Sequence, residues 1–254
     1  SSEFNLPGLS SDRVNVIAGG VVILEAIFRT FGLEQMNVCD TAMREGLLYD
    51  MLGRALHTDS RNTSIQALAE RNDVDEIQAM RVGLTAANLF SQVAEHWQLD
   101  VQAQELLNWC AHVHEIGLAI AHSQHHAHGA YIIGNSDLAG FGRQEQQQLA
   151  AILRSHRRKP DTATMASLPP RMQPATQRLT ALLRLAVLLH RARSSDAMPT
   201  LRLTARQGEL TLELPGSWLE NHPLTRIDLE QERDHLKLID IKLIVSKSSS
   251  RIAA

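Results

Sequence analysis

A long series of amphipathic helix signals between about Ser60 and Arg193 limits the fold of this chain more than any other feature. Apolar residues recur there at the three-to-four-residue spacing of a helix, without an internal repeat or a low-complexity tract. The cap signals predict helix starts at Thr63-Ser64, between Asp73 and Asp75, and at Asp100, Arg143 and Pro174. The sequence therefore predicts an all-α domain over residues 57–198, with a loop rich in Pro, Thr and Ser from Lys159 to Pro174 before its last long helix.

The character of the sequence changes after Pro199. Leucines alternate with polar residues on both sides of Gln207-Gly208, which is typical of a β-hairpin. A helix-like stretch from Leu224 to His235 and an apolar run from Ile239 to Val245 follow. These signals predict a small α+β subdomain over residues 199–254.

The first part of the chain is predicted to be a remnant of a larger domain, residues 5–56. Residues 1–4 resemble a cloning scar, and a helix is expected up to residue 31, beginning properly after Gly19-Gly20 and ending at a left-handed Gly32. A short strand from Met36 to Cys39 and a helix ending near Leu56 should follow. A single short strand cannot satisfy its own backbone groups, so we expect its sheet partner to be missing.

Composition excludes several classes of function. The chain has 254 residues, 44% of them hydrophobic, and a formal net charge of −3, so a polyanion would have to meet a local basic patch. No apolar run is long enough to span a bilayer and no secretory signal is apparent, which predicts a cytoplasmic protein without a membrane partner. Cys39 and Cys110 lie far apart, and both are expected to be reduced core thiols.

Six histidines fall between His112 and His128, and this density invites a metal hypothesis. His114-Glu115-Ile116-Gly117 is similar to the His-Asp-Ile-Gly core of metal-dependent HD phosphohydrolases. The other ligands of such a site are absent, because no His precedes Arg81 in its helix and residues 182–190, LLRLAVLLH, are mostly apolar and contain no Asp where the closing one is expected. We therefore predict no metal, with His114 and Glu115 as vestigial HD-like residues that are buried and hydrogen-bonded at a helix junction. The remaining histidines are expected to line a loop.

No catalytic residue is predicted in this chain. It has no phosphate-binding loop of the GxxxxGK type, no GxSxG elbow and no acidic pair in a suitable context. The Gly19-Gly20 pair has two interpretations: a close approach of the backbone to a neighbouring element, or a position facing a ligand.

One dense basic segment precedes Pro160. Such a segment can be a solvated helix end that favours the helix dipole. It can equally be a track for a run of phosphates, because it places several positive charges together. On the second interpretation, the predicted polyphosphate-binding residues are Arg154, His156, Arg157, Arg158 and Lys159.

Several segments together resemble the exopolyphosphatase and guanosine pentaphosphate phosphohydrolase family. Residues 16–54, VIAGGVVILEAIFRTFGLEQMNVCDTAMREGLLYDMLGR, resemble the end of its actin-like portion, with Arg44, Glu45, Gly46 and Tyr49 at matching positions and Met43 in place of the usual Leu. The likeness continues in DSRNTSIQALAE, in residues 114–141 and in SHRRK. It covers essentially the whole chain after the first residues.

The resemblance implies an actin-like remnant, an HD-like all-α domain without a metal centre and a small α+β subdomain. It implies that Gly19, Gly20, Arg44 and Glu45 face the cleft of the intact enzyme, which would use Mg²⁺, whereas this fragment holds no cofactor. The function expected is the accessory part of an exopolyphosphatase: it binds and guides inorganic polyphosphate and supports a homodimer, binds no specific nucleic acid and is inactive alone. The alternatives are a metal-dependent HD phosphohydrolase, a guanosine pentaphosphate phosphohydrolase and a non-catalytic dimerisation module. Polyphosphate is preferred because SHRRK is more basic than a nucleotide site requires.

Overall fold

The computed structural model describes residues 14–36, 59–194, 196–206 and 208–248, and the chain divides into two compact units, 1–49 and 50–254. In the first unit, α1 (Val14–Phe31) runs through Gly19-Gly20. The predicted start after the glycines is therefore wrong, since a helix can continue through glycine at a cost of only roughly 1 kcal/mol for each one. The left-handed cap is confirmed: Gly32 has φ +62°. Of the predicted strand at Met36–Cys39, the structure describes only Met36, which is exposed and not in a strand; residues 37–39 and the helix after them fall outside the described residues.

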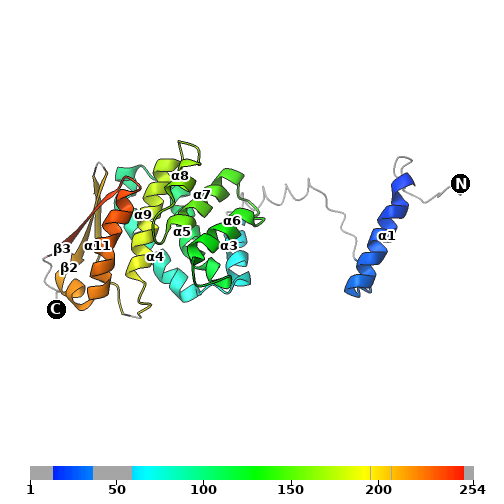
Figure 1. The fold of residues 1–254 in the computed structure, drawn as a ribbon, viewed down its shortest axis with the longest axis horizontal. Helices are drawn as coiled ribbons and strands as arrows, with labels where there is room; N and C mark the ends of the chain where they lie inside the picture. The colour runs from blue at the N-terminus through cyan, green and yellow to red at the C-terminus, as the bar shows by residue number, and fades with distance from the viewer. Residues whose placement is uncertain (1–13, 37–58, 195, 207, 249–254) are drawn as a thin grey trace. The chain divides into compact units, whose positions relative to one another are not determined.

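The second unit is mostly helical, as predicted, and Figure 1 shows its helices packed around α4, α5 and α9. The elements up to residue 189 are α3 (Ser60–Arg71), α4 (Glu76–Trp97), α5 (Val101–His112), the 3-10 turn η1 (Ile116–Ala119), α6 (His125–Asn135), α7 (Arg143–Ser155), α8 (Thr162–Ala166) and α9 (Gln173–Leu189).

Aspartate side chains cap the starts of four described helices, α3, α4, α5 and α8. The side chains of Asp75 and Asp100 accept hydrogen bonds from Gln78 N at 3.0 Å and Ala103 N at 2.8 Å, as predicted for these two starts. The start of α3 is three residues earlier than predicted, because Asp59 caps it. The loop after Lys159 was predicted without structure, but Asp161 accepts from Thr164 N at 3.0 Å and begins the short helix α8.

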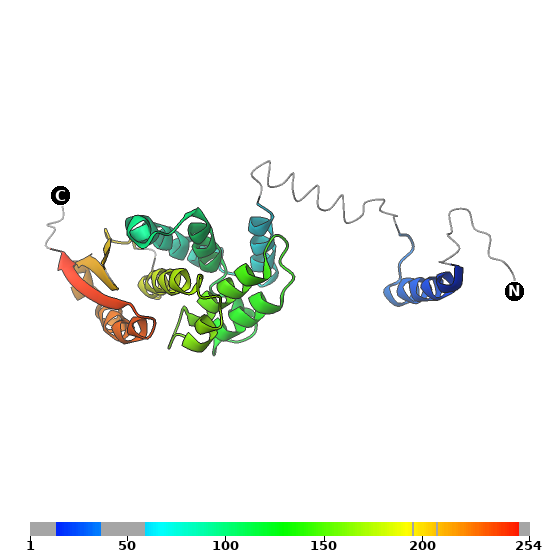
Figure 2. The same ribbon diagram turned by 90° about the horizontal axis from the view of Figure 1, so that it is seen from above.

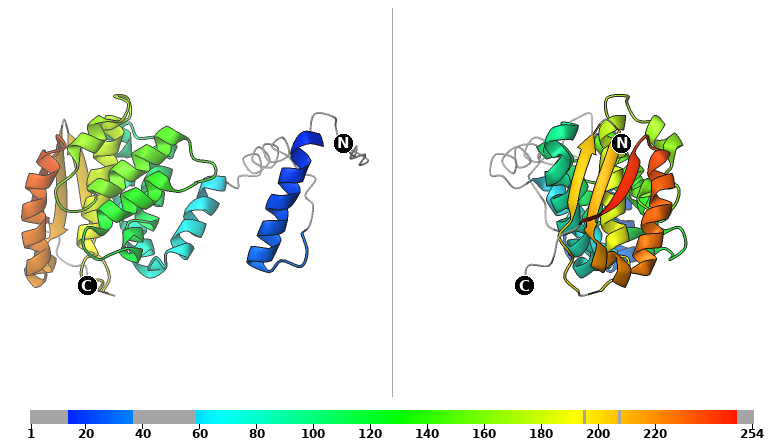
Figure 3. Two further views of the ribbon diagram at one scale, coloured as in Figure 1. Left: turned by 45° about the vertical axis from the view of Figure 1, so that its right-hand side comes forward. Right: turned by 90° about the vertical axis from the view of Figure 1, so that its left-hand side faces the viewer.

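A three-stranded sheet completes the unit, with β1 (Arg202–Arg206), β2 (Glu209–Pro215) and β3 (Lys242–Ser248) in the order β1-β2-β3. The hairpin of β1 and β2 is antiparallel, as predicted, whereas β3 pairs parallel to β2 after the crossover through α10 (Gly216–Asn221) and α11 (Pro223–Lys237). Figures 2 and 3 show the sheet at one end of the helices, where β1 contacts α4 and α11 contacts α9.

One hydrophobic core joins the helices to the sheet. Leu182 and Leu185 of α9 belong to the same buried cluster as Leu203, Leu210 and Leu212 of the hairpin. Residues 50–254 therefore form one compact unit, and the division at residue 198 stays a prediction from the sequence. Within the described ranges, no helix has the length and the apolar character needed to cross a membrane.

Cys110 lies at the centre of this core. It is a free thiol that is fully buried, and its burial raises the pKa of the thiol well above its usual value. The prediction of a reduced core thiol is confirmed for Cys110, whereas Cys39 lies outside the described residues.

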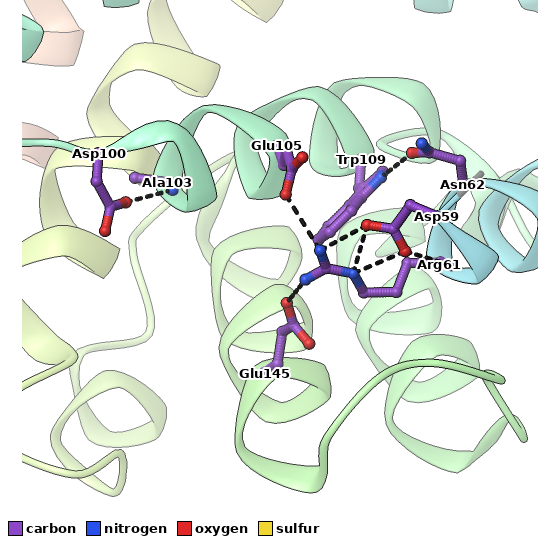
Figure 4. Close-up of polar contacts among 8 residues, drawn as sticks. All are labelled: Asp59, Arg61, Asn62, Asp100, Ala103, Glu105, Trp109 and Glu145. Atoms are coloured by element: carbon purple, nitrogen blue, oxygen red, sulfur yellow. Dashed lines mark hydrogen bonds and ion pairs between the residues drawn. The ribbon is translucent and has the colours of Figure 1, made fainter. Parts of the chain in front are cut away.

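Arg61 fastens α3 to the rest of the bundle, as Figure 4 shows. Its guanidinium lies 4.5 Å from the ring centroid of Trp109 on α5, and it pairs with Asp59 and with Glu145 of α7 at 2.5 Å and with Glu105 of α5 at 3.2 Å. Because this cation is half-buried and has three carboxylate partners, it stabilises the contact of α3 with both helices.

The backbone of Gly117 in η1 touches the start of α6. A Cβ added at Gly117 would lie 1.9 Å from the carbonyl oxygen of His125 and 2.5 Å from the amide nitrogen of Gly129. No side chain fits in this space. Glycine at position 117 therefore allows the turn after His114 to lie directly against the helix that carries His125.

We expect the substitution Gly117→Ala to separate η1 from α6. The new methyl group would clash with main-chain atoms that cannot rotate away, so the free energy of unfolding should fall by about 2–3 kcal/mol, as in other overpacked cores. Chemical denaturation of the two purified chains measures this difference.

Gly134→Ala is the matched control on α6. A Cβ there meets nothing within 4 Å, and alanine favours a helix over glycine, so this variant should be as stable as the parent or up to about 1 kcal/mol more stable. A Gly117→Ala chain that is as stable as the Gly134→Ala chain would show that η1 can move away at no cost.

Candidate anion-binding site

A cavity of about 550 Å³ opens between the helices of the second unit. Its walls come from five segments: the first turn of α4, the turn between α5 and α6, the carboxyl end of α7, the last turns of α9 with the residues after it, and one face of α11. Its polar and charged lining residues are Gln78, His114, Glu115, His122, His125, His156, Arg157, Arg158, Arg184, Arg191, Arg193, Asp228, Gln231, Glu232 and His235.

The cavity brings together two sequence signals that were predicted separately. His114 and Glu115 of the vestigial HD-like motif lie on one side of it, and His156, Arg157 and Arg158 of the basic segment lie on another. They meet because α6 contacts both η1 and α7. The structure therefore places the two motifs in one site.

The basic segment begins where α7 ends. His156 is the C-cap residue of α7, and its Nδ1–H donates to the carbonyl oxygen of Leu153 at 2.7 Å. Arg158 has a left-handed backbone with φ +58°, which turns the chain away from the helix axis. These two features direct consecutive side chains into the cavity.

Two of the five predicted phosphate-binding residues are placed differently. Arg154 pairs with Asp161 at 3.2 Å, and Lys159 is exposed to solvent. Neither is among the residues that line the cavity. Their role as part of a phosphate track stays a prediction.

Four buried imidazoles are clustered around the basic segment: His114, His125, His126 and His156 are each at most 7% exposed. The ring centroid of His156 lies 5.9 Å from that of His114, 5.8 Å from that of His125 and 6.4 Å from that of His126. The histidines after His114 were predicted to line a loop, but His125 and His126 begin α6. Their closeness to the His114 motif in sequence is the signal that could have identified them.

Several ring nitrogens in this cluster have no hydrogen-bond partner among the described residues. His114 donates through Nδ1 to the carbonyl oxygen of Ala111 at 2.7 Å, as His156 does to Leu153, so each neutral ring leaves Nε2 as an unpaired acceptor. Nδ1 of His126 is also unpaired. Buried polar atoms usually have a partner, and these exceptions mark the cluster as a place where a polar ligand or a proton could bind.

Burial keeps these imidazoles neutral near pH 7. It lowers the pKa of His156 well below its usual value, with further lowering from His114 and His125. Burial also lowers the pKa of His114, against the opposing charge of Glu115, and the pKa of His126, which falls to about 4. For His125, burial and then Arg157 lower the pKa.

The arginines of the cavity divide into paired and unpaired groups. Arg193 pairs with Glu115 at 2.6 Å, Arg191 pairs with Asp228 at 2.7 Å, and Arg184 pairs with Glu232. Within the part of the chain that the structure describes, Arg157 and Arg158 have no carboxylate partner, and Arg157 instead donates from Nη1 to Nδ1 of His125 at 3.2 Å. The cavity therefore has an excess of positive charge at these two residues, which suits an anion.

The described residues do not suit a resident metal ion. Among them, no three His, Cys, Asp or Glu side chains are arranged to hold one, and the cavity contains no nucleophile paired with a base. Of the predicted cleft-facing residues, Gly19 and Gly20 lie in α1, where an added Cβ would meet nothing within 4 Å, whereas Arg44 and Glu45 lie outside the described ranges.

Two comparisons with known proteins bear on this geometry. The chain matches the domain III model of the Ppx/GppA phosphatases over residues 60–233, which includes most of the cavity, and the Ppx/GppA phosphatase family model over residues 1–55.

Two curated relatives carry the name guanosine-5'-triphosphate,3'-diphosphate pyrophosphatase. The protein from Pseudoalteromonas translucida is 37% identical over 95% of this chain and 49% of its own length, and that from Photobacterium profundum is 35% identical over 91% of this chain and 46% of its own length. The chain thus spans about half the length of the curated relatives it matches. With a family model covering residues 60–233, the chain belongs to the Ppx/GppA phosphatase family.

Proposed function

We propose that this chain is the accessory part of a phosphoric anhydride hydrolase and that its cavity binds inorganic polyphosphate. The observation that carries the proposal is the position of Arg157 and Arg158, which line a cavity of about 550 Å³ without a carboxylate partner among the described residues. Phosphate oxygens suit the planar fork of an arginine particularly well. A polymer held at several phosphates dissociates slowly, so such a site would guide the substrate toward a catalytic lobe.

Chemistry is not assigned to the cavity itself. Catalysis and the binding of Mg²⁺ would belong to the intact protein, since phosphoryl transfer depends on a positioned metal and water. The intact protein would also form the homodimer. Within the described residues, Arg157 and Arg158 would bind phosphate oxygens, and the buried imidazoles beside them would accept protons.

Guanosine pentaphosphate is the second candidate ligand. The observation that favours it is the name that both relatives carry, at 35% and 37% identity to this chain. Competition experiments separate the two candidates. If polyphosphate is the ligand, the concentration of polyphosphate that displaces labelled guanosine pentaphosphate should be lower than the concentration of guanosine pentaphosphate that displaces labelled polyphosphate.

The double substitution Arg157→Glu/Arg158→Glu should weaken binding of long-chain polyphosphate. Two charge-assisted contacts of about 1.5–3 kcal/mol each would be lost, so the dissociation constant should rise at least about a hundredfold. The slope of log affinity against log salt concentration should become shallower by about two counterions. Calorimetric titrations at two salt concentrations measure both quantities.

Arg202→Glu/Arg206→Glu is the matched control, because it makes the same change of net charge on β1, outside the cavity. It should weaken binding only slightly, through long-range electrostatics. Equal losses in both double variants would mean that net charge, and not the cavity, determines binding.

Binding should be accompanied by proton uptake. The free imidazoles have lowered pKa values, and a bound anion would stabilise their protonated forms, which raises those pKa values on binding. A pKa that rises on binding makes the affinity increase as pH falls through the bound-state pKa toward the free-state pKa, which is about 4 for His126. Titration of cyclic trimetaphosphate, which does not itself titrate in this range, into two buffers of different ionisation enthalpy counts the protons; release of protons would contradict the proposal.

The isolated chain should release no phosphate from polyphosphate, even with Mg²⁺. The reason is that the described residues bring together neither a metal ligand set nor a nucleophile with its base. An assay of released orthophosphate checks this, and activity that remains with the purified chain through successive chromatography steps would refute it.

A further inference from the structure

Arg184 of α9 is a charged side chain that is almost completely buried, with 3% of its surface exposed. Its Nε and Nη2 donate to the two carboxylate oxygens of Glu232 on α11, at 2.5 and 2.9 Å. Its Nη1 donates to the main-chain carbonyl oxygen of Ser155 at 2.5 Å. A buried arginine therefore connects three helices, α9, α11 and the carboxyl end of α7.

Ser155 is the residue at which the basic segment begins. It is the last residue of α7, so its carbonyl has no partner within the helix and needs an external donor. Its hydroxyl group accepts from the amide of Asp161 at 3.0 Å. The hydrogen bond to the Ser155 carbonyl thus holds the chain before Arg157 and Arg158, and the hydrogen bond from Asp161 to the Ser155 hydroxyl holds the chain after them.

We propose that Arg184 is the positioning residue of the anion site. By holding the Ser155 carbonyl, it sets the direction in which His156 and Arg157 leave α7, and through them the contact between Arg157 and His125. Glu232 neutralises the buried charge and orients the guanidinium. The effect of Arg184 on ligand binding rests on the proposed function, whereas its effect on the geometry of the free site does not.

A purely structural role would be to hold α11 against α9. Replacing both partners tests this, because a buried ion pair can often be exchanged for apolar side chains of similar size without loss of stability. Arg184→Met/Glu232→Met would keep the packing of the two helices and leave the Ser155 carbonyl without its donor. This variant therefore separates the packing of α11 against α9 from the orientation of the segment after Ser155.

The experiment uses the 254-residue chain and records histidine ring signals by NMR as a function of pH, with thermal unfolding and polyphosphate titration on the same samples. In the double variant, the melting temperature should fall slightly, because the buried Ser155 carbonyl loses its donor, and by less than in either single variant, which would leave a buried charge unpaired. The pKa of His125 should rise toward its usual value, because Arg157, one of the groups that lower it, would move away. The dissociation constant for long-chain polyphosphate should rise about tenfold or more, as when an outer partner that orients a ligand is lost.

Two further variants serve as a conservative substitution and as a control for lost stability. Arg184→Lys keeps the charge but cannot reach both acceptors at once, so it should shift the His125 titration in the same direction and by less. Leu179→Ala, a fully buried position earlier on α9, lowers stability without touching Ser155, so it should leave the His125 titration unchanged.

The inference is overturned if the His125 titration is the same in the parent, the double variant and Arg184→Lys, or if Leu179→Ala shifts it as much as they do. If the titration shifts as expected but the parent chain binds no polyphosphate, the proposed function fails and the positioning role of Arg184 stands.

Discussion

The contact between the backbone of Gly117 and the first turn of α6 determines how the buried histidines of the site are arranged. Because no Cβ fits there, η1 lies directly against the main chain of His125 and Gly129. The turn that carries His114 and the helix that carries His125 are therefore neighbours, and α7 brings His156 against both. Imidazoles packed in this way lose their solvation and stay neutral, so the positive charge of the site comes from arginines alone.

Features decided by adjacent residues could be predicted from the sequence. The caps at Asp75 and Asp100 and the hairpin around Gly208 each depend on a few neighbouring side chains, and all three were found. The start of α3 was misplaced because Asp59 competes with Thr63 as a cap, and the sequence does not reveal which of two good caps is used. The parallel pairing of β3 could not be predicted, since it depends on how α11 crosses the sheet.

The site was predicted only in pieces. His114 was identified from its motif and Arg157 from local charge, but their meeting depends on the packing of α6 against η1 and α7, which no local pattern encodes. The contributions of Arg184 and Glu232 were missed for the same reason, because an isolated charged residue in an amphipathic helix usually faces solvent. Long-range pairing of this kind is visible only once the helices are placed.

α11 has two roles, since it is the crossover between β2 and β3 and one face of it closes the cavity. Its residues come after every other segment that lines the site. During synthesis from the amino terminus, the helices up to α9 could pack before α11 has left the ribosome, and Arg184 would then lack the carboxylate that neutralises it. The cavity would therefore be completed late in translation, because an incomplete nascent chain would still lack the helix that closes it.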